Sequence, residues 1–407
     1  MKIIPRTLAH TITRAAKTFP AVVITGPRQS GKTTLLRHMF GDTHRFYSLE
    51  DLDVRDRVQR DPRAFLAECG RPVVIDEVQY APRLLSYLKT EIDNDRKPGN
   101  WILTGSQNFA LMAGVSQSLA GRAAVLTLLP FSFREANFLG DLDISMEGIL
   151  ASLGGGKPET THFQEKHPNI WDFLLRGSYP EPCANPEVDR QLWCSGYVQL
   201  YLERDVRQIL NVSDLSVFER FLQLTAARTA QILNFSELAR DVGVTMPTIK
   251  KWIGVLEASY LVFLLPPYFK NYGKRLVKNP KLYFLDTGLA TYLLKIHARD
   301  ALVHGPLAGA LFETLVVGEW VKEFFHRGER LPLYFWRSHD DLEVDLLIER
   351  NGKLFPIEIK ASSTITQDQA NGLEKWMKRS GCSAGTIVAP VEQSFQLTDR
   401  VRVLNLV

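Results

Sequence analysis

The sequence has 407 residues, a formal net charge of +4 and 45% hydrophobic residues. This length favours roughly two to three domains, and the mild positive charge permits a nucleic-acid partner without requiring one. The four cysteines are widely separated, which argues against a disulfide framework and a zinc site, and no apolar run approaches the roughly 18 residues of a membrane helix. We therefore expect a cytoplasmic protein with reduced thiols and no membrane contact.

The first strong motif is a phosphate-binding loop between the apolar run 21–24 and the helical run 34–39. Lys32 is expected to contact phosphates and the Thr33 hydroxyl to ligate Mg²⁺, while the start of the following helix favours an anion. The candidate nucleotide-binding residues are Gly26, Pro27, Arg28, Gln29, Ser30, Gly31, Lys32, Thr33 and Thr34.

Three further short apolar runs, at 45–49, 72–77 and 101–106, are spaced as strands that alternate with helices. They predict a parallel sheet covered by helices. Asp76 and Glu77 end the second run, at the sheet edge where ligands bind. We expect Asp76 to hold Mg²⁺ through water and Glu77 to orient and deprotonate the attacking water, the alternative being an acidic strand end that caps a helix.

Two more segments place polar residues near this predicted site. Ser106 and Gln107 follow the third run and are candidates for sensing the γ-phosphate, although Ser106 would equally serve as a helix cap. Arg122 precedes the apolar run 124–129 and is a candidate arginine finger, acting within its chain or from a neighbouring subunit of a homo-oligomer. It would equally be a surface arginine.

These motifs together resemble the AAA-type predicted ATPases of bacteria and archaea. The resemblance rests on the loop, on the strand ends at 75–79 and 103–106, and on the segment 119–122, and it extends over nearly the whole chain. It implies ATP as the nucleotide and an α/β protein whose P-loop NTPase core is followed by a winged helix and a restriction-endonuclease-like fold. We accordingly expect a core at 1–140, a linker and helical subdomain at 141–228, a winged helix at 229–290 and a restriction-endonuclease-like α/β domain at 291–407.

The middle of the chain fits this order. Turn-forming residues fill 140–168, and helical spacing follows from 171 to 228. The predicted apolar face of this region comprises Leu192, Tyr197, Leu200, Tyr201, Val206 and Leu210. Arg204 with Asp205 would form a lid contact or an exposed ion pair. From 234 to 256 the pattern predicts a helix-turn-helix, with caps at Ser236 and Thr245 and a turn at Gly243.

A basic segment follows the helix-turn-helix, between two apolar runs expected to complete the winged helix. Duplex or branched DNA is the partner that its lysines and arginines suggest, with docking of a protein as the alternative. The basic residues of this segment are Lys270, Lys274, Arg275, Lys278 and Lys281, and Lys250 and Lys251 on the second helix of the helix-turn-helix add to its positive charge.

The C-terminal part contains a predicted hairpin. Asn351-Gly352 favours a two-residue turn, so opposed residues have numbers that sum to 703. Asp345 then faces Glu358, and Glu343 faces Lys360. Because opposed carboxylates repel, a divalent ion between them is an economical explanation.

Asp345 with Glu358-Ile-Lys360 is similar to the Asp…Glu-x-Lys hairpin of restriction-endonuclease-like nucleases, although Val344 replaces the usual proline. The resemblance implies Asp345, Glu358 and Glu313 as metal ligands and Lys360 as a catalytic residue. The alternative is a solvated hairpin in an inactive module. The sequence thus predicts an ATP-hydrolysing protein that couples nucleotide state to nucleic-acid binding, either with metal-dependent nuclease activity or as an ATP-controlled DNA- or protein-binding switch.

Overall fold

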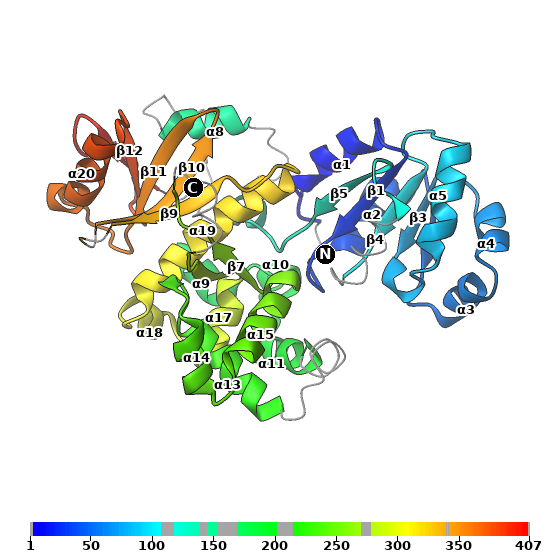
Figure 1. Ribbon diagram of the computed structural model, residues 1–407, viewed down its shortest axis with the longest axis horizontal. Helices are drawn as coiled ribbons and strands as arrows, with labels where there is room; N and C mark the ends of the chain where they lie inside the picture. Colours follow the sequence, from blue (N-terminus) through cyan, green and yellow to red (C-terminus); the bar gives the residue numbers. More distant parts are fainter. Residues whose placement is uncertain are drawn as a thin grey trace. The chain divides into compact units, whose positions relative to one another are not determined.

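The computed structural model describes residues 3–106, 118–138, 145–153, 169–201, 215–269, 278–338, 340 and 342–405. The predictions for Gln107, Arg204, Asp205, Val206, Leu210, Lys270, Lys274 and Arg275 lie outside these residues. The chain forms two compact units (Figure 1). The first comprises Met1–Leu142, Ala258–Tyr260 and Lys322–Arg330; the second comprises Asp143–Glu257, Leu261–Val321 and Leu331–Val407.

The first unit contains a parallel sheet whose described strands follow the order β2-β3-β4-β1-β5. The five runs predicted as strands, at 21–24, 45–49, 72–77, 101–106 and 124–129, are confirmed, with ends that differ by one or two residues. The elements in chain order are α1 (Leu8–Ala16), β1 (Ala21–Thr25), α2 (Lys32–Phe40), β2 (Arg45–Ser48), α3 (Leu52–Arg60), α4 (Pro62–Glu68), β3 (Val73–Asp76), η1 (Val78–Tyr80), α5 (Leu84–Asn94), β4 (Trp101–Thr104), β5 (Ala123–Thr127) and α7 (Phe133–Ala136).

Helices cover both faces of this sheet, which explains why its central strands are almost wholly apolar. Ala21 and Val23 of β1 pack with residues of α3, α4 and α5 in one core. Val22 and Ile24 point the other way and pack with α1 and α2 in a second core. Helices thus pack on both faces of the sheet, and the phosphate-binding loop leaves β1 at the carboxyl end of the strands (Figure 1).

The second unit is mixed helix and strand. Its described elements are α8 (Met146–Leu153), α9 (Ile170–Arg176), α10 (Pro180–Ala184), α11 (Arg190–Tyr201), α13 (Leu215–Ala226), β6 (Gln231–Ile232), α14 (Phe235–Val242), α15 (Met246–Ala258), β7 (Val262–Leu265), β8 (Lys281–Phe284), α17 (Thr287–Leu293), α18 (Arg299–Val303), α19 (Ala308–His326), β9 (Leu333–Arg337), β10 (Glu343–Arg350), β11 (Lys353–Ile359), η3 (Gln367–Ala370), α20 (Asn371–Ser380), β12 (Gly385–Val388), β13 (Phe395–Gln396) and β14 (Val401–Leu404). The last residues of α15 and α19 belong to the first unit.

The predicted helix-turn-helix is present as α14 and α15. Gly243 makes the turn with a φ of 85°, and the Thr245 hydroxyl accepts from the Thr248 N–H at 3.3 Å. Ser236 is not the cap of α14, because the Asn234 side chain accepts from the Glu237 N–H at 3.2 Å. A small antiparallel sheet in the order β6-β8-β7 accompanies these helices.

The C-terminal hairpin joins β10 to β11 in a sheet with the order β13-β14-β12-β11-β10-β9. Asn351 and Gly352 have φ values of 52° and 73°, as a two-residue turn of this kind requires. The predicted register is confirmed where the strands pair, with Leu346 opposite Ile357. Helix α20 packs on this sheet through Leu373, Trp376 and Met377.

The apolar face predicted for α11 is only partly correct. Tyr197 is buried as predicted, but Leu192 and Leu200 are 73% and 61% exposed, and Cys194 and Val198 are buried instead. All four cysteines are free thiols. None of the helices that the structure describes combines the length and apolarity needed to span a membrane.

Candidate nucleotide site and carboxylate cluster

The phosphate-binding loop runs from the end of β1 to Lys32, the first residue of α2. Gly31 has a φ of 92° and Gln29 a φ of 58°, so the backbone curls through left-handed conformations. At Gly26 a Cβ atom would lie 2.1 Å from the Leu128 carbonyl oxygen, which leaves room only for glycine. Since the first N–H groups of a helix lack intrahelical acceptors, the start of α2 favours an anion.

Lys32 supplies a buried positive charge to this loop. Its Nζ donates to the carbonyl oxygens of Gly26 at 3.1 Å and Pro27 at 2.7 Å. Burial lowers the pKa of Lys32 to about 8, although the nearby Glu77 and Asp76 carboxylates oppose the shift. The lysine is therefore held inside the loop, where a phosphate would replace carbonyl oxygens as its partner.

Thr33 and Asp76 meet at the same edge. The Thr33 hydroxyl donates to Asp76 Oδ2 at 2.8 Å. Thr104, at the end of β4, donates to Asp76 Oδ1 and was not anticipated from the sequence. The hydroxyl and carboxylate oxygens assembled here are hard donors of the kind that Mg²⁺ prefers.

Glu77 is held beside this pair by several contacts. Its backbone has a φ of 57°, and its N–H donates to the Thr104 hydroxyl at 3.0 Å. Glu77 Oε2 accepts from the Ser106 hydroxyl at 2.9 Å and from the Gln79 amide. Ser106 is thus brought to the site. Gln79 was not named as a site residue, although it ends the segment 75–79 on which the family resemblance partly rests.

The remaining predicted loop residues differ in exposure. Ser30 is fully buried, and within the described part of the chain its hydroxyl has no hydrogen-bond partner. Arg28 is half-buried, whereas the side chains of Gln29 and Thr34 are exposed. A curled backbone, a buried lysine, and a threonine beside an aspartate fit a nucleotide with its Mg²⁺.

Arg122 lies elsewhere in the first unit. It precedes β5, and since Ala123 pairs with Ala21, it is at the sheet edge opposite the phosphate-binding loop. Its guanidinium forms a paired contact with Asp93, at 2.6 and 2.8 Å. The strand β5 rises roughly 3.3 Å per residue and separates Arg122 from the phosphate-binding loop. Of the three roles left open for Arg122, the one within its own chain does not fit this placement.

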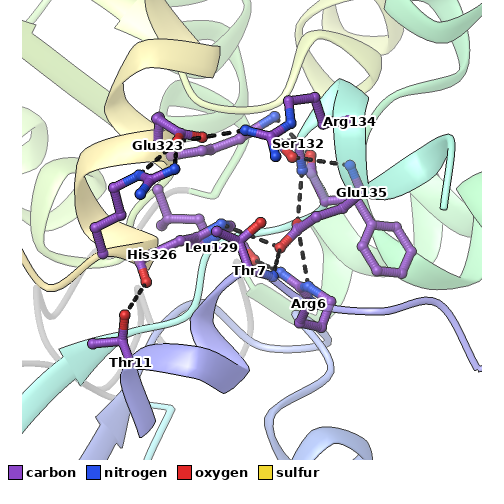
Figure 2. A network of polar contacts seen from close by, with 12 residues as sticks. Arg6, Thr7, Thr11, Leu129, Ser132, Arg134, Glu135, Glu323 and His326 are labelled. Atoms are coloured by element: carbon purple, nitrogen blue, oxygen red, sulfur yellow. Dashed lines mark hydrogen bonds and ion pairs between the residues drawn. The ribbon is translucent and has the colours of Figure 1, made fainter. Parts of the chain in front are cut away.

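A buried polar network also contacts the loop (Figure 2). Arg6 donates to the Ser30 carbonyl at 2.9 Å and to the Leu129 carbonyl at 2.5 Å, and pairs with Glu135 at 3.2 Å. His326 Nδ1 lies 3.4 Å from the other Glu135 oxygen. Burial alone would raise the pKa of Glu135, but Arg6 and His326 outweigh it and hold the pKa well below its usual range.

In the second unit, carboxylates from two elements surround Lys281 of β8. Its Nζ lies 3.0 Å from Glu313, contacts Glu343 and is 3.9 Å from Asp345. The Tyr283 hydroxyl also donates to Glu313, at 2.6 Å. Lys281 is only 5% exposed, so the expectation that it lies along a DNA backbone is wrong.

The other two predicted residues, Glu358 and Lys360, contact each other and interact electrostatically with Asp345. Lys360 donates to Glu358 at 2.7 Å, and Asp345 accepts from the Ile359 N–H at 2.8 Å. Burial raises the pKa of Glu313 to about 7, with repulsion from Asp345 adding to it and Lys281 opposing it. Burial and Asp345 likewise raise the pKa of Glu358 to about 7.

The four predicted residues Glu313, Asp345, Glu358 and Lys360 interact electrostatically, and a metal site among them remains a prediction. Among the residues that the structure describes, no three His, Cys, Asp or Glu side chains are placed to hold a metal ion. The carboxylates of Glu313 and Asp345 instead share the ammonium of Lys281. No spacing rule in the sequence pointed to this lysine.

Three family models match the chain. Residues 18–137 match an AAA domain, residues 167–300 a domain of unknown function (DUF8612) and residues 308–407 a second domain of unknown function (DUF4143). Among solved structures, similarity extends to the Walker-type ATPase PABY2304 of Pyrococcus abyssi, with 15% identity, a TM-score of 0.41, and coverage of 72% of this chain and 99% of that one. A RuvB variant from Thermotoga maritima has 17% identity and a TM-score of 0.27, over 64% of this chain and 89% of its own.

Two curated mycobacterial proteins are similar along nearly the entire sequence. The uncharacterized proteins Rv2008c of Mycobacterium tuberculosis and Mb2031c of Mycobacterium bovis are each 30% identical over 404 residues, which is 98% of this chain and 83% of theirs. With the AAA and DUF4143 matches, this similarity shows that the chain belongs to the family of AAA-type P-loop ATPases that carry a C-terminal domain of unknown function.

Proposed function

We propose that this protein hydrolyses ATP and that its nucleotide state controls binding of nucleic acid. The observation that carries the proposal is the meeting of Thr33, Asp76 and Glu77 beside Lys32, at one sheet edge of an AAA domain. Such an arrangement supplies what phosphoryl transfer needs, namely charge neutralisation and a positioned nucleophile.

Residues 26–34 would hold the phosphates of ATP, with Lys32 placing its ammonium against them. Thr33 and Asp76 would hold Mg²⁺, which when bound neutralises phosphate charge. Thr104 supports this arrangement because its hydroxyl donates to Asp76 and orients the carboxylate.

Glu77 would act as the general base. In the described structure the contacts of its carboxylate are made by Oε2, so we assign Oε1 to the attacking water. Ser106 and Gln79 fix the carboxylate for this task. The proton passes from water to Glu77 as the water oxygen bonds to the γ-phosphorus and the bond to ADP breaks.

Arg122 would act only from a neighbouring subunit, after release from Asp93. Mixing Lys32→Ala with Arg122→Ala chains tests this assignment. Each variant alone is expected to be inactive, whereas a mixture gains ATPase activity because the Lys32→Ala chain lends its Arg122 to an intact loop. A mixture that stays inactive would exclude the assignment.

Nucleic-acid binding is assigned to α14, α15 and the sheet β6-β8-β7, whose order matches that of a winged helix. Lys250 and Lys251 are exposed on α15, the second helix of the helix-turn-helix, and Lys278 is exposed before β8. Exposed lysines around such a helix support contact with a phosphate backbone.

A second candidate function differs only in the C-terminal module, which would be an inactive nuclease fold in an ATP-controlled switch. One observation favours it over a metal-dependent nuclease: Lys281 already neutralises Glu313, Glu343 and Asp345. A divalent ion at these carboxylates would meet a buried positive charge.

One titration tests the proposed function and separates the two versions of the C-terminal module. Single-stranded, duplex and branched DNA are incubated with Mg²⁺ or Mn²⁺, with and without ATP, for wild type, Lys32→Ala and Asp345→Ala. Cleavage that disappears in Asp345→Ala identifies a nuclease. Intact DNA with nucleotide-dependent binding identifies the switch, and absence of ATP hydrolysis by wild type contradicts the whole proposal.

A further inference from the structure

Arg6, Glu135 and His326 form a continuous chain of direct contacts inside the first unit, here termed the Arg6 relay (Figure 2). It begins at the Ser30 carbonyl of the phosphate-binding loop and ends at His326, the last residue of α19. The side chains of Arg6, Glu135 and His326 are 5%, 0% and 1% exposed, so water does not compete for these contacts.

The geometry at Arg6 makes it a rigid connector. One planar guanidinium donates to Ser30 and Leu129 and pairs with Glu135, and it also lies 4.7 Å from the centre of the Phe131 ring. Because the fork of an arginine is planar, its donors cannot follow separate partners independently. Movement of the Ser30 carbonyl therefore changes how Arg6 meets Glu135.

Glu135 connects Arg6 to His326, because each of its two carboxylate oxygens faces one of them. Oε1 accepts from the Thr7 N–H at 2.8 Å and faces His326, while Oε2 accepts from the Ser132 N–H at 2.9 Å and faces Arg6. A carboxylate held by two backbone N–H groups has little freedom to turn. Because the two oxygens belong to one rigid carboxylate, a shift of Arg6 at Oε2 also acts on Oε1, which faces His326.

The end of α19 is held by further contacts within this unit. The Thr11 hydroxyl donates to the His326 carbonyl at 2.9 Å, and Lys322 donates to the Phe131 carbonyl at 2.9 Å. Glu323 lies 3.6 Å from Arg134 (Figure 2). The same helix also carries Glu313, one of the carboxylates that contact Lys281.

We propose that the Arg6 relay reports the nucleotide state of the phosphate-binding loop to the last turn of α19. The proposal rests on the proposed function, since it needs a nucleotide at the loop. It makes Arg6 a positioning residue that acts through the Ser30 carbonyl, rather than a group that touches phosphate.

Hydrogen–deuterium exchange tests the relay directly. Wild type, Arg6→Met and the control Lys17→Met, an exposed lysine at the end of α1, are compared with and without ATPγS and Mg²⁺. In wild type and the control, the nucleotide is expected to change exchange in both 26–35 and 322–330. In Arg6→Met, the change at 26–35 is expected to remain while that at 322–330 is lost.

Arg6→Lys provides a second variant, because it keeps the charge beside Glu135 but cannot span the three acceptors of arginine. If circular dichroism shows that Arg6→Met is unfolded, Arg6→Lys decides the outcome. The nucleotide-induced change in exchange at 322–330 should again be lost. Equal changes at 322–330 in wild type and Arg6→Lys would overturn the relay, as would nucleotide binding to wild type with no change at 322–330. Failure of wild type to bind ATPγS at all would instead overturn the proposed function.

Discussion

The Thr33 hydroxyl donates a hydrogen bond of 2.8 Å to Asp76 and thereby joins the first turn of α2 to the end of β3. One residue comes from the phosphate-binding loop motif and the other from a strand that lies 43 residues further along the chain. Their meeting brings together the two oxygen donors expected to hold Mg²⁺. The hydroxyl is therefore a sensitive point at which to test the nucleotide site.

Thr33→Val should leave the fold intact and abolish most ATP hydrolysis, because valine keeps the shape of threonine and removes the hydroxyl. We expect kcat to fall by about 100-fold or more, the loss expected for a missing electrostatic contact in a closed site. A steady-state ATPase assay at varied Mg²⁺ checks this. Thr13→Val, on the exposed side of α1, is the matched control and should behave as wild type.

Glu77→Gln should separate binding from hydrolysis. Glutamine keeps the contacts with Ser106 and Gln79 but cannot accept the proton of water, so we expect kcat to fall by about 10²–10⁴-fold with little change in ATP affinity. Isothermal titration with ATPγS and an ATPase assay measure the two effects. Unchanged hydrolysis by Glu77→Gln would remove Glu77 from the role of general base.

Glu135→Gln should lower stability in a pH-dependent way. The pKa of Glu135 is depressed in the folded state, so its contribution is fully present above the pKa of the unfolded carboxyl, about 4.3, and is lost as pH falls below it. At pH 7 the substitution leaves Arg6 unpaired and should cost about 3 kcal/mol.

Urea unfolding of wild type and Glu135→Gln between pH 7 and pH 3.5 checks this prediction. The difference in unfolding free energy should shrink only below about pH 4.3. Glu323→Gln, whose carboxylate is partly exposed, is the control and should cost less. A difference between wild type and Glu135→Gln that persists unchanged to pH 3.5 would contradict the depressed pKa.

Lys281→Met should destabilise the protein by about 3 kcal/mol, because it leaves Glu313, Glu343 and Asp345 together without their shared cation. Denaturant unfolding at neutral pH measures the loss, and Lys278→Met, at an exposed lysine, is the control. If Lys281→Met were as stable as wild type, the lysine would not be the counter-ion of the cluster.

Local patterns predicted local structure well. The phosphate-binding loop and the Asn351-Gly352 turn are encoded within a few residues, so their conformations and the register of Leu346 with Ile357 follow directly. The helical spacing of apolar residues also correctly predicted that α11 is a helix. It could not indicate which side of that helix neighbouring elements cover, and Leu192, predicted on the apolar face, is exposed.

Contacts between distant segments account for what the sequence did not predict. Lys281 lies 32 residues before Glu313, and Arg6 lies 123 residues before Leu129, so no spacing rule relates them. The role of Lys281 was misread because a lysine next to a basic loop looks solvent-exposed until its strand is placed. For Arg122 the sequence left three roles open, because its end of the sheet is known only from the parallel pairing of β5 with β1.

The central claim, that the loop nucleotide controls nucleic-acid binding, is tested most directly by the affinity for labelled duplex and branched DNA. Fluorescence anisotropy at one fixed salt concentration gives the Kd with ATPγS, with ADP and without nucleotide, for wild type and Lys32→Ala. We predict a Kd that changes by about 5-fold or more between nucleotide states in wild type, as allosteric coupling typically gives, and does not change in Lys32→Ala. The same wild-type Kd in all three states would contradict the claim.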